Sequence, residues 1–410
     1  MTVISLEKLF LDRALYEFKM LYGEVRCKKN FDLFFIYILV LNLFFSCNLI
    51  AYLFLPKEIV PSKMIIIFHT GEIEIVRYGK ILPSSTGLIL QECDLIRTFS
   101  GSVDIQSGNG NLIRIKPYTE IILKNLPNKQ HKETNLYFQS GELLIKTDKL
   151  KTDESFYIST STTVADVRGS IFSLKLTEGS QSPEVKVYEG AVGMNFKIPN
   201  KILEKIKTMN EKVYDEFIIF LEKNEVVLDK REVSLIRPSQ DRMIQLILTK
   251  VENKEDISKE LATIQKIENF SLQKTTFVET PQEIAEIETL VRVDRIIVDQ
   301  ALAEQDSNEV QPFISSISSE IQRDQNSKLD QALNKIQTKI EENVLKYESE
   351  IYEYYNVFET VVKEDGSKLS GAIVTQVGDT LILHTLKGAI RLNKNEIDYV
   401  DYQSSIIKNK

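Results

Sequence analysis

The chain has little of the chemistry on which metal sites and most catalytic sites depend. It contains three cysteines, Cys27, Cys47 and Cys93, and three histidines that lie far apart in sequence. So few cysteines cannot form a disulfide framework, and their spacing does not match a zinc site. The sequence also lacks H-E-x-x-H, C-x-x-C and G-x-S-x-G motifs. We therefore expect no metal, no cofactor and no enzymatic activity.

An excess of positive charge is also missing. The 51 lysines and arginines are outnumbered by 59 aspartates and glutamates, which gives a net charge of −8. A nucleic acid would require clustered cations to neutralise its phosphates, whereas here both signs are interleaved. We expect no nucleic-acid partner. The length of 410 residues and a hydrophobic content of 43% allow two or three domains with a large core.

One long segment contains no charge at all, from Leu33 to Leu55. An apolar helix of about 20 residues spans a bilayer, so residues 31–56 are predicted to form a transmembrane helix. Arg26, Lys28 and Lys29 precede it and should stay in the cytoplasm with the rest of residues 1–30. Everything after residue 56 would then lie in the periplasm or at the cell surface.

A lipoprotein signal explains the same segment equally directly. Lys28 and Lys29 would form its basic region, Leu33 to Phe45 its apolar region, and Ser46 would precede a lipidated Cys47. Both interpretations attach the chain to a membrane through residues 31–56. The sequence does not decide between them, nor between the inner and the outer membrane.

Residues 71–196 are predicted to be β-structure. Apolar and polar residues alternate in short runs such as Leu112 to Lys116, and turn clusters such as Ser107 to Asn111 separate the runs. Many short strands at about ten-residue spacing favour a solenoid, a sandwich or a barrel. The lysines and glutamates within the strands are expected to face solvent, because alternate side chains point to opposite faces of a sheet.

Residues 200–355 change to a helical period, and residues 356–402 return to β. Apolar residues in the helical region are spaced by four or seven positions, as in an amphipathic helix. They include Ile202, Ile206, Val213 and Phe217. A longer stripe, from Leu329 to Ile351, predicts either a bundle that packs on itself or a coiled-coil arm that joins another chain in an oligomer. The last segment resembles a small SH3-like or Sm-like barrel.

The predicted fold class is therefore α+β and multidomain. An apolar membrane segment leads into an all-β solenoid or sandwich, then a helical spacer and a small C-terminal β-barrel.

Five motifs in the β-region occur in the order found in one known family. They are Gly71-Glu72-Ile73-Glu74-Ile75, Leu90 to Thr98, Ser140-Gly141-Glu142-Leu143-Leu144, Thr160 to Phe172, and Val187-Tyr188-Glu189-Gly190-Ala191-Val192. Together they resemble the FecR domain, the periplasmic module of iron-dicitrate-type cell-surface signalling regulators. Cys93 stands where that family usually has glycine, Ser161 where it has proline, and Ser170 where it has threonine.

The resemblance implies a set of signature residues with structural roles. They are Asp94, Arg97, Thr98, Gly141, Val167, Arg168, Gly169, Phe172, Glu189 and Gly190. Gly169 permits backbone geometry that a Cβ would forbid. The guanidinium of Arg168 offers five donors in a fixed fork and is expected to bind carbonyls or a carboxylate inside the fold, with Glu189 or Asp94 as its partner. The alternative is that Arg168 binds a ligand.

The family's regulators have a cytoplasmic helical segment, a membrane helix and a sensor, and residues 1–30 are too short to form that first segment. We therefore predict a membrane-anchored, non-catalytic envelope protein whose FecR-like domain binds a ligand, an envelope protein or the cell wall. The alternative is a transmembrane signal transducer that regulates a cytoplasmic sigma factor.

Overall fold

The computed structural model describes residues 63–126, 133–150, 154–176, 182–267, 270–304 and 311–402. The chain divides into two units, residues 1–59 and residues 60–410, and everything described belongs to the second. The predicted membrane segment 31–56 and the candidate lipidation site Cys47 lie outside the described residues. Among the helices that are described, none combines the length and apolarity that a bilayer crossing requires.

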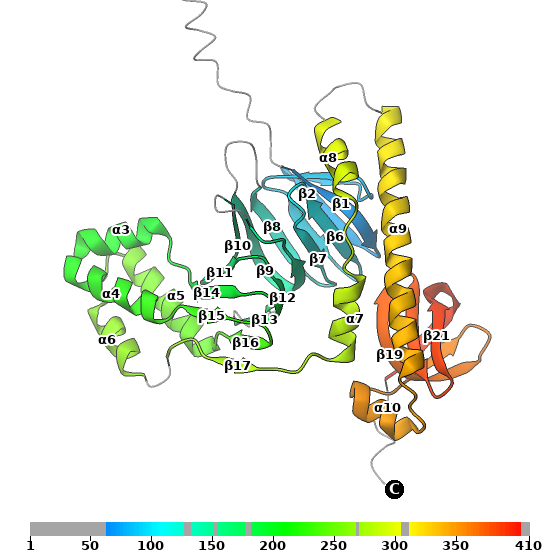
Figure 1. The fold of residues 1–410 in the computed structure, drawn as a ribbon. Helices are drawn as coiled ribbons and strands as arrows, with labels where there is room; N and C mark the ends of the chain where they lie inside the picture. The colour runs from blue at the N-terminus through cyan, green and yellow to red at the C-terminus, as the bar shows by residue number, and fades with distance from the viewer. Residues whose placement is uncertain are drawn as a thin grey trace, which may run out of the picture. The chain divides into compact units, whose positions relative to one another are not determined.

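Two β-sheets form the first part of the described chain (Figure 1). Sheet A contains, in spatial order, β4 (Ile89–Gln91), β1 (Lys63–Thr70), β6 (Ser102–Ser107), β7 (Leu112–Ile115), β9 (Glu133–Lys146), β12 (Ile171–Leu176), β13 (Pro183–Glu189), β16 (Glu232–Leu235) and β17 (Lys274–Thr276). Sheet B contains β3 (Lys80–Leu82), β2 (Ile73–Arg77), β5 (Leu95–Thr98), β8 (Glu120–Asn125), β9, β10 (Ser155–Ser159), β11 (Thr163–Val167), β14 (Val192–Phe196) and β15 (Val226–Leu228).

Strand β9 belongs to both sheets. Residues before Gly141 pair with β8 and β10 in sheet B, and residues from Gly141 onward pair with β7 and β12 in sheet A. Gly141 has a φ of +100°, which L side chains rarely adopt, and a Cβ built there would lie 2.2 Å from the Thr119 hydroxyl oxygen. Glycine is therefore required where the strand crosses from one sheet to the other.

Two signature glycines, Gly169 and Gly190, mark two further crossings between the sheets. Gly169 lies between β11 of sheet B and β12 of sheet A, and Gly190 lies between β13 of sheet A and β14 of sheet B. Their φ angles are +87° and +80°, and a Cβ on Gly190 would lie 2.3 Å from the Gly169 carbonyl oxygen. The Ser170 hydroxyl donates to Ala191 O at 2.6 Å and accepts from Ala191 N at 3.0 Å, which joins the two turns.

The inner faces of the two sheets share one apolar core. Side chains from both sheets contribute, and Phe138, Phe156 and Phe172 are among the largest that are fully buried. Alternation along the strands brings these residues to the inner face, as the period of two requires. Burial of a Phe side chain contributes about 1.5–3 kcal/mol, so this core provides most of the stabilisation of the two sheets.

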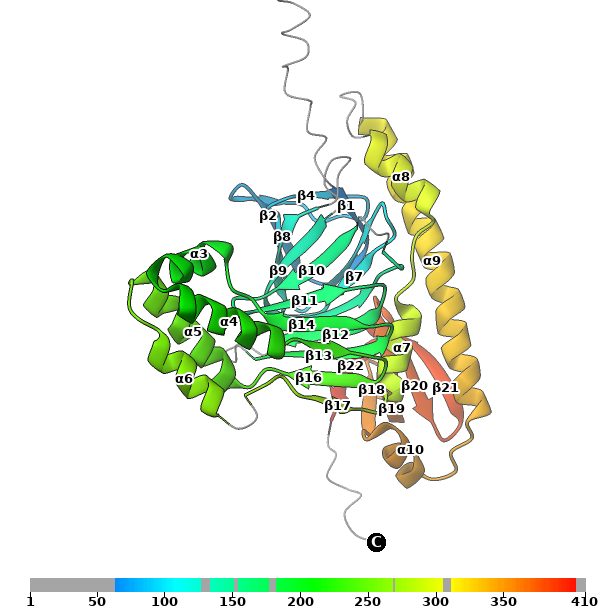
Figure 2. The ribbon, with the colours of Figure 1, turned by 60° about the vertical axis from the view of Figure 1, so that its left-hand side comes forward.

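Four helices extend this core at one end of the sheets (Figure 2). They are α3 (Asn200–Met209), α4 (Glu211–Lys223), α5 (Pro238–Glu252) and α6 (Ser258–Lys266). Phe217 and Phe220 of α4 stack with each other, and Phe220 also stacks on Phe196 at the end of β14. These helices are inserted between the last strands of the two sheets, because β15, β16 and β17 follow β14 along the chain but pair within the sheets.

Three further helices are α7 (Pro281–Thr289), α8 (Arg295–Glu304) and α9 (Gln311–Glu342). A second apolar cluster joins them to the outer face of sheet A, with Ile65 and Ile67 of β1 packed among Val293, Val298 and Ile321. The outer face of sheet A is therefore covered by helices rather than by solvent along β1.

The C-terminal module consists of α10 (Glu348–Tyr355) and a five-stranded antiparallel sheet. Its strands are β18 (Glu359–Lys363), β19 (Lys368–Val377), β20 (Thr380–Thr385), β21 (Gly388–Asn393) and β22 (Ile397–Asp401), and a 3-10 turn, η1 (Lys394–Glu396), precedes β22. The spatial order is β21-β20-β19-β18-β22. Buried His384 of β20 accepts or donates a hydrogen bond to the Tyr355 hydroxyl of α10 at 2.9 Å.

These observations overturn the predicted fold class. The β-region is two facing sheets and not a solenoid, because its strands alternate between sheets at tight crossings instead of stacking as successive parallel rungs. The C-terminal sheet is open, since its end strands β21 and β22 do not pair with each other in the part of the chain that is described. The helical spacer is wrong as well, because residues 200–355 supply three strands of the two sheets.

The apolar stripe of α9 is covered within the same chain. Leu333, Ile336 and Ile340 are buried in a cluster with α7, α10 and strands β19 and β20. Val344 and Tyr347, which continue the stripe in sequence, lie beyond the helix and are 73% and 65% exposed. The predictions of a helical bundle and of a coiled-coil arm were both incomplete, because the stripe also packs against the C-terminal sheet.

We expect Gly190→Ala to destabilise the protein by about 2–5 kcal/mol, from about 1–2 kcal/mol of left-handed backbone strain and about 1–3 kcal/mol of overpacking. Gly79→Ala is the matched control, because Gly79 has a similar φ of +76° but nothing within 4 Å of its Cβ position. It should lose only the backbone contribution. Urea unfolding of both variants measures the difference, and equal losses would contradict the steric role of Gly190.

Candidate functional site

The signature residue Asp94 is a buried structural anchor. Its carboxylate is fully inaccessible and accepts two hydrogen bonds from Arg77, Nε to Oδ1 at 2.8 Å and Nη2 to Oδ2 at 2.7 Å. The Gln91 backbone N–H donates to it as well, at 2.8 Å. A bidentate arginine with an additional backbone donor stabilises a buried carboxylate well. Asp94 thus fixes the turn between β4 and β5 to β2.

Arg97 and Thr98, at the end of β5, have different environments. Arg97 is on the solvent side of sheet B, where its Nε binds Glu120 at 2.8 Å and its Nη1 binds Glu74 at 3.3 Å. Thr98 is buried, and its hydroxyl donates to Lys116 O at 2.6 Å and accepts from Thr119 N at 2.9 Å. Thr98 therefore fixes the turn between β7 and β8, which packs against Gly141.

Arg168 does not have the environment that the sequence suggested. Its side chain is 78% exposed, and the ion pair described for it is with Asp166, at 3.7 Å. Asp94 binds Arg77 instead, and Glu189 is exposed at the end of β13. The neighbouring signature residues Val167 and Phe172 are fully buried. Gly169 and Gly190 pack against each other, and the side chain of Arg168 is exposed next to this close contact.

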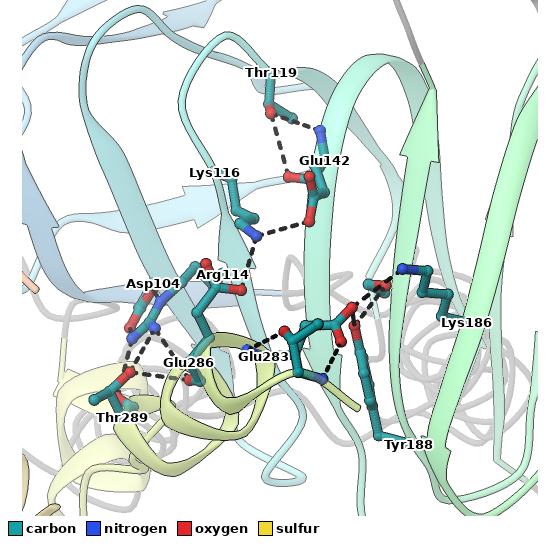
Figure 3. A network of polar contacts seen from close by, with 12 residues as sticks. Asp104, Arg114, Lys116, Thr119, Glu142, Lys186, Tyr188, Glu283, Glu286 and Thr289 are labelled. Atoms are coloured by element: carbon teal, nitrogen blue, oxygen red, sulfur yellow. Dashed lines mark hydrogen bonds and ion pairs between the residues drawn. The ribbon is translucent and has the colours of Figure 1, made fainter. Parts of the chain in front are cut away.

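An extended polar network lies elsewhere, between sheet A and helix α7 (Figure 3). We call it the α7 seam, and its members are Asp104, Arg114, Lys116, Glu142, Lys186, Tyr188, Glu283, Glu286 and Thr289. Strands β6, β7, β9 and β13 supply the sheet side, and α7 supplies the rest. The seam therefore joins residues separated by more than 90 positions in sequence.

Arg114 is the centre of the seam. Its side chain is 9% exposed, and it binds Asp104 through two parallel hydrogen bonds of 2.8 Å. Its remaining donors bind the C-terminus of α7, with Nη1 to the Thr289 hydroxyl and Nη2 to the Thr289 carbonyl, both at 3.0 Å. A cation at a helix C-terminus is favourable because the helix dipole is negative there. Asp104 of β6 therefore neutralises Arg114, while the remaining donors of Arg114 bind the end of α7.

Lys116 forms a second connection next to Arg114. Its ammonium binds Glu142 of β9 at 2.7 Å and Glu286 of α7 at 2.8 Å. Burial alone would lower the pKa of Lys116, but the two carboxylates outweigh it and raise that pKa above its usual value. The lysine therefore stays charged while it connects sheet A to the middle of α7.

Glu283 connects the start of α7 to β13. It accepts from Lys186 and from the Tyr188 hydroxyl, each at 3.1 Å, and closes a capping box with Thr280. Burial alone would raise the pKa of Glu283, but the Thr280 backbone N–H and the Lys186 ammonium hold it below its usual value. Burial raises the pKa of Tyr188 well above its usual value, so its hydroxyl stays protonated and donates to Glu283.

The opposite side of α7 is apolar and faces the C-terminal module. Ala285 is 3% exposed in the cluster that contains the α9 stripe, Ile351 and Tyr355 of α10, and Val374 of β19. Gln282 donates to the Tyr355 carbonyl at 3.2 Å. Helix α7 is thus held by charges against sheet A and by apolar contacts against the C-terminal module.

A cavity of about 420 Å³ adjoins the seam. Arg114, Lys116 and Glu286 line it together with Ser100, and Lys394 lines it from the C-terminal module. Its size suits a small ligand. The seam carboxylates already neutralise Arg114 and Lys116, so among the lining cations Lys394 alone has no ion pair within the described chain. For a metal ion, the described residues contain no group of three or more His, Cys, Asp or Glu side chains that could hold it.

The seam was not predicted from the sequence, because the charged residues of the strands were expected to face solvent. Arg114 and Asp104 do alternate with apolar residues, but α7 covers the face on which they lie. The capping box Thr280-Pro281-Gln282-Glu283 is a helix-start signal that could have identified α7. No local signal indicates where that helix docks.

We expect Arg114→Gln to destabilise the protein by about 3–5 kcal/mol, since removing one partner leaves Asp104 buried and unpaired. Arg97→Gln, which breaks a partly exposed pair on sheet B, should lose no more than about 1 kcal/mol. Urea unfolding measures both. The double variant Asp104→Leu/Arg114→Met should recover part of the loss, and a double variant as unstable as Arg114→Gln would contradict this assignment.

Comparison with known proteins locates the family within the sheets. Two crystal structures of a candidate anti-sigma factor from Parabacteroides distasonis align with the chain at 10% identity and a TM-score of 0.29. The alignments cover 47% of this chain and 62% and 64% of those structures, so the chain spans less than two thirds of either. No curated protein matched the sequence. The family model described as FecR protein matches residues 94–193, and these residues, from Asp94 to the crossing after Gly190, form a FecR domain.

Proposed function

We propose that the protein is a membrane-anchored, non-catalytic envelope protein whose FecR domain binds a ligand or a protein outside the inner membrane. The observation that carries the proposal is the match of residues 94–193 to the FecR family, which is regulatory and not known for enzymes. The uncharged segment from Leu33 to Leu55 supports the anchor. The function proposed is therefore recognition coupled to regulation.

The state of the buried charges supports a role in recognition rather than catalysis. Asp94, Asp104 and Arg114 are each neutralised by a partner at 2.7–2.8 Å. Catalytic groups are usually held with a reactive atom free to meet a substrate. Here the ionic groups of Asp94, Asp104 and Arg114 hold strands and α7 in place.

The edges of sheet B are suitable surfaces for a partner. The sheet ends at β3 and β15, and each edge strand exposes an apolar side chain, Ile81 at 70% and Val227 at 50%. An extended peptide can add to such an edge through main-chain hydrogen bonds, with side-chain contacts giving specificity. Tyr78, 82% exposed in the turn before β3, would add apolar area at the same edge.

Helix α7 provides the means to pass a change on to the C-terminal module. Its charged side holds four strands of sheet A, and its apolar side packs on α10 and β19. A ligand or partner that shifts sheet A would have to break ion pairs of the seam or move α7 with the sheet. Movement of α7 would then change its packing against α10 and β19 of the C-terminal module.

A transmembrane signal transducer that regulates a cytoplasmic sigma factor is the second candidate. The FecR match favours it, since the regulators of this family are of that kind. It requires a cytoplasmic effector, and a pull-down with residues 1–30 tests for one. Capture of a sigma factor by this segment would favour the second candidate over the first.

Cys93 reports on the location of the FecR domain. It is free and exposed, whereas Cys27 lies in the segment expected in the cytoplasm. We expect a membrane-impermeant maleimide to label Cys93 in intact spheroplasts, and to label Cys27 only after lysis, since the bilayer would separate the two thiols. Single-cysteine variants allow each site to be measured by gel shift.

Protection of Cys93 until lysis would contradict the proposed location. Mass spectrometry of the mature N-terminus completes the experiment. A chain that begins at diacylated Cys47 establishes the lipoprotein form and explains any missing Cys27 signal. A chain that retains Cys27 and carries no lipid establishes the transmembrane form.

A photo-crosslinking amino acid at position 81 should capture the envelope partner, because the Ile81 side chain projects from the β3 edge. The same amino acid at Val344, which is 73% exposed but lies outside the sheets, is the control. Crosslinked products in membranes are identified by mass spectrometry. Identical product patterns at the two positions, or none at position 81, would contradict binding at this edge.

A further inference from the structure

A second cavity lies at the C-terminal end of α7, and its character differs from that of the seam cavity. It measures about 460 Å³ and is formed by the end of β9, the end of α7 with the segment that follows, and α9. Four cationic side chains line it, Lys146, Arg292, Lys328 and Lys335, together with one carboxylate, Glu288. This volume falls within the range of small-molecule sites.

Two of the four cations already have anionic partners. Arg292 binds Asp148 at 2.6 Å, and Lys328 binds Asp324 at 2.7 Å. The lining carboxylate Glu288 is paired with Lys339 of α9 through Oε1, and its buried Oε2 has no hydrogen-bond partner within the described chain. The ammonium groups of Lys146 and Lys335 make no hydrogen bond or ion pair among the contacts of the described residues. The cavity is therefore lined by two ammonium groups that have no hydrogen-bonded or ion-paired partner within the described chain.

The donors that remain point to a missing acceptor. The Nε–H of Arg292 is buried and has no partner within the described chain, although the other two nitrogens of its guanidinium are bound. Burial, and then the nearby Arg292, lower the pKa of Lys146, and they outweigh the opposite effect of Asp148 and Glu189. A buried donor without an acceptor costs about 1–3 kcal/mol, and a desolvated cation next to another cation is also unfavourable. An anion in the cavity would relieve both.

We propose that this cavity binds a small oxyanion of the phosphate or phosphate-monoester class, held by Lys146, Lys335 and Arg292. An oxyanion would give the two unpaired ammonium groups a direct partner, and its oxygens are acceptors for the free Arg292 Nε–H. Charge-assisted hydrogen bonds of this kind are short and strong. The three groups come from β9, from the segment after α7 and from α9, so the bound anion connects the FecR domain to the long helix.

Isothermal titration of the protein with inorganic phosphate, at low ionic strength in a chloride-free buffer, tests the proposal. We expect Lys335→Gln and Lys146→Met each to weaken phosphate binding by at least about tenfold, which is the effect of losing about 1.4 kcal/mol. Arg323→Gln is the matched control. It removes one positive charge from an exposed position on the same helix without touching the cavity, and should leave binding within about twofold.

Thermal unfolding separates a binding role from a structural one. Without phosphate, Lys146→Met should leave the melting temperature unchanged or higher, because the substitution removes a desolvated cation. Phosphate should raise the melting temperature of the unmodified protein and not that of the variant, since only a ligand that binds the folded state stabilises it. A lower melting temperature of Lys146→Met without phosphate, or equal stabilisation of both proteins, would overturn the proposal.

The phosphate group could also belong to a lipid. Co-sedimentation with phosphatidylglycerol vesicles, and with phosphatidylcholine vesicles as the uncharged comparison, distinguishes the source. Binding to the anionic vesicles that Lys335→Gln abolishes, without binding of free phosphate, would assign the oxyanion to a headgroup. The site does not exist if neither free phosphate nor anionic vesicles bind, or if both bind equally well to Lys335→Gln.

Discussion

The two sheets depend on corners at which the chain changes sheet within three residues or fewer and in which a side chain has no room. At Gly141, Gly169 and Gly190, a Cβ would lie less than 3 Å from neighbouring atoms. Each of these glycines also has a positive φ. The steric requirement and the backbone requirement coincide, so no other residue satisfies both. Because the corners are tight, the strands on either side emerge in register in opposite sheets and share a single core.

The charged face of sheet A has a different role from its core. A buried ion pair such as Arg114 with Asp104 adds little net stability, because desolvation offsets most of the attraction. It is directional, however, and its unused donors bind one place on α7. The apolar side of α7 then determines where the C-terminal module packs. Hydrophobic contacts provide most of the stability of this region, while the ion pairs determine which surfaces meet.

The β-character of residues 71–196 and their FecR resemblance could be predicted from the sequence, because both are written in local patterns. Alternation identifies strands, and the glycines of the signature mark the corners. The burial of Arg114 could not be predicted, since the residue of α7 that binds it is 175 positions away in sequence and the helix has no marker of its docking surface. The exposure of Arg168 was missed for the opposite reason, because a signature arginine was assumed to face inward. The open edge of the C-terminal sheet also escaped prediction, since closure depends on how far β21 and β22 are kept apart and not on the pattern within each strand.

Strand β9 has a position that no other described strand shares. It is the middle member of both sheets, with four described strands on either side of it in each. Among the described strands, those before β9 do not pair with those after it, so the two halves of the sheets meet along β9. The domain consequently has no seam at which it could be divided into independently folding fragments. A shortened chain that ends before β9 would leave β7 in sheet A and β8 in sheet B without their pairing partner. A chain that begins after β9 would leave β12 and β10 unpaired in the same way.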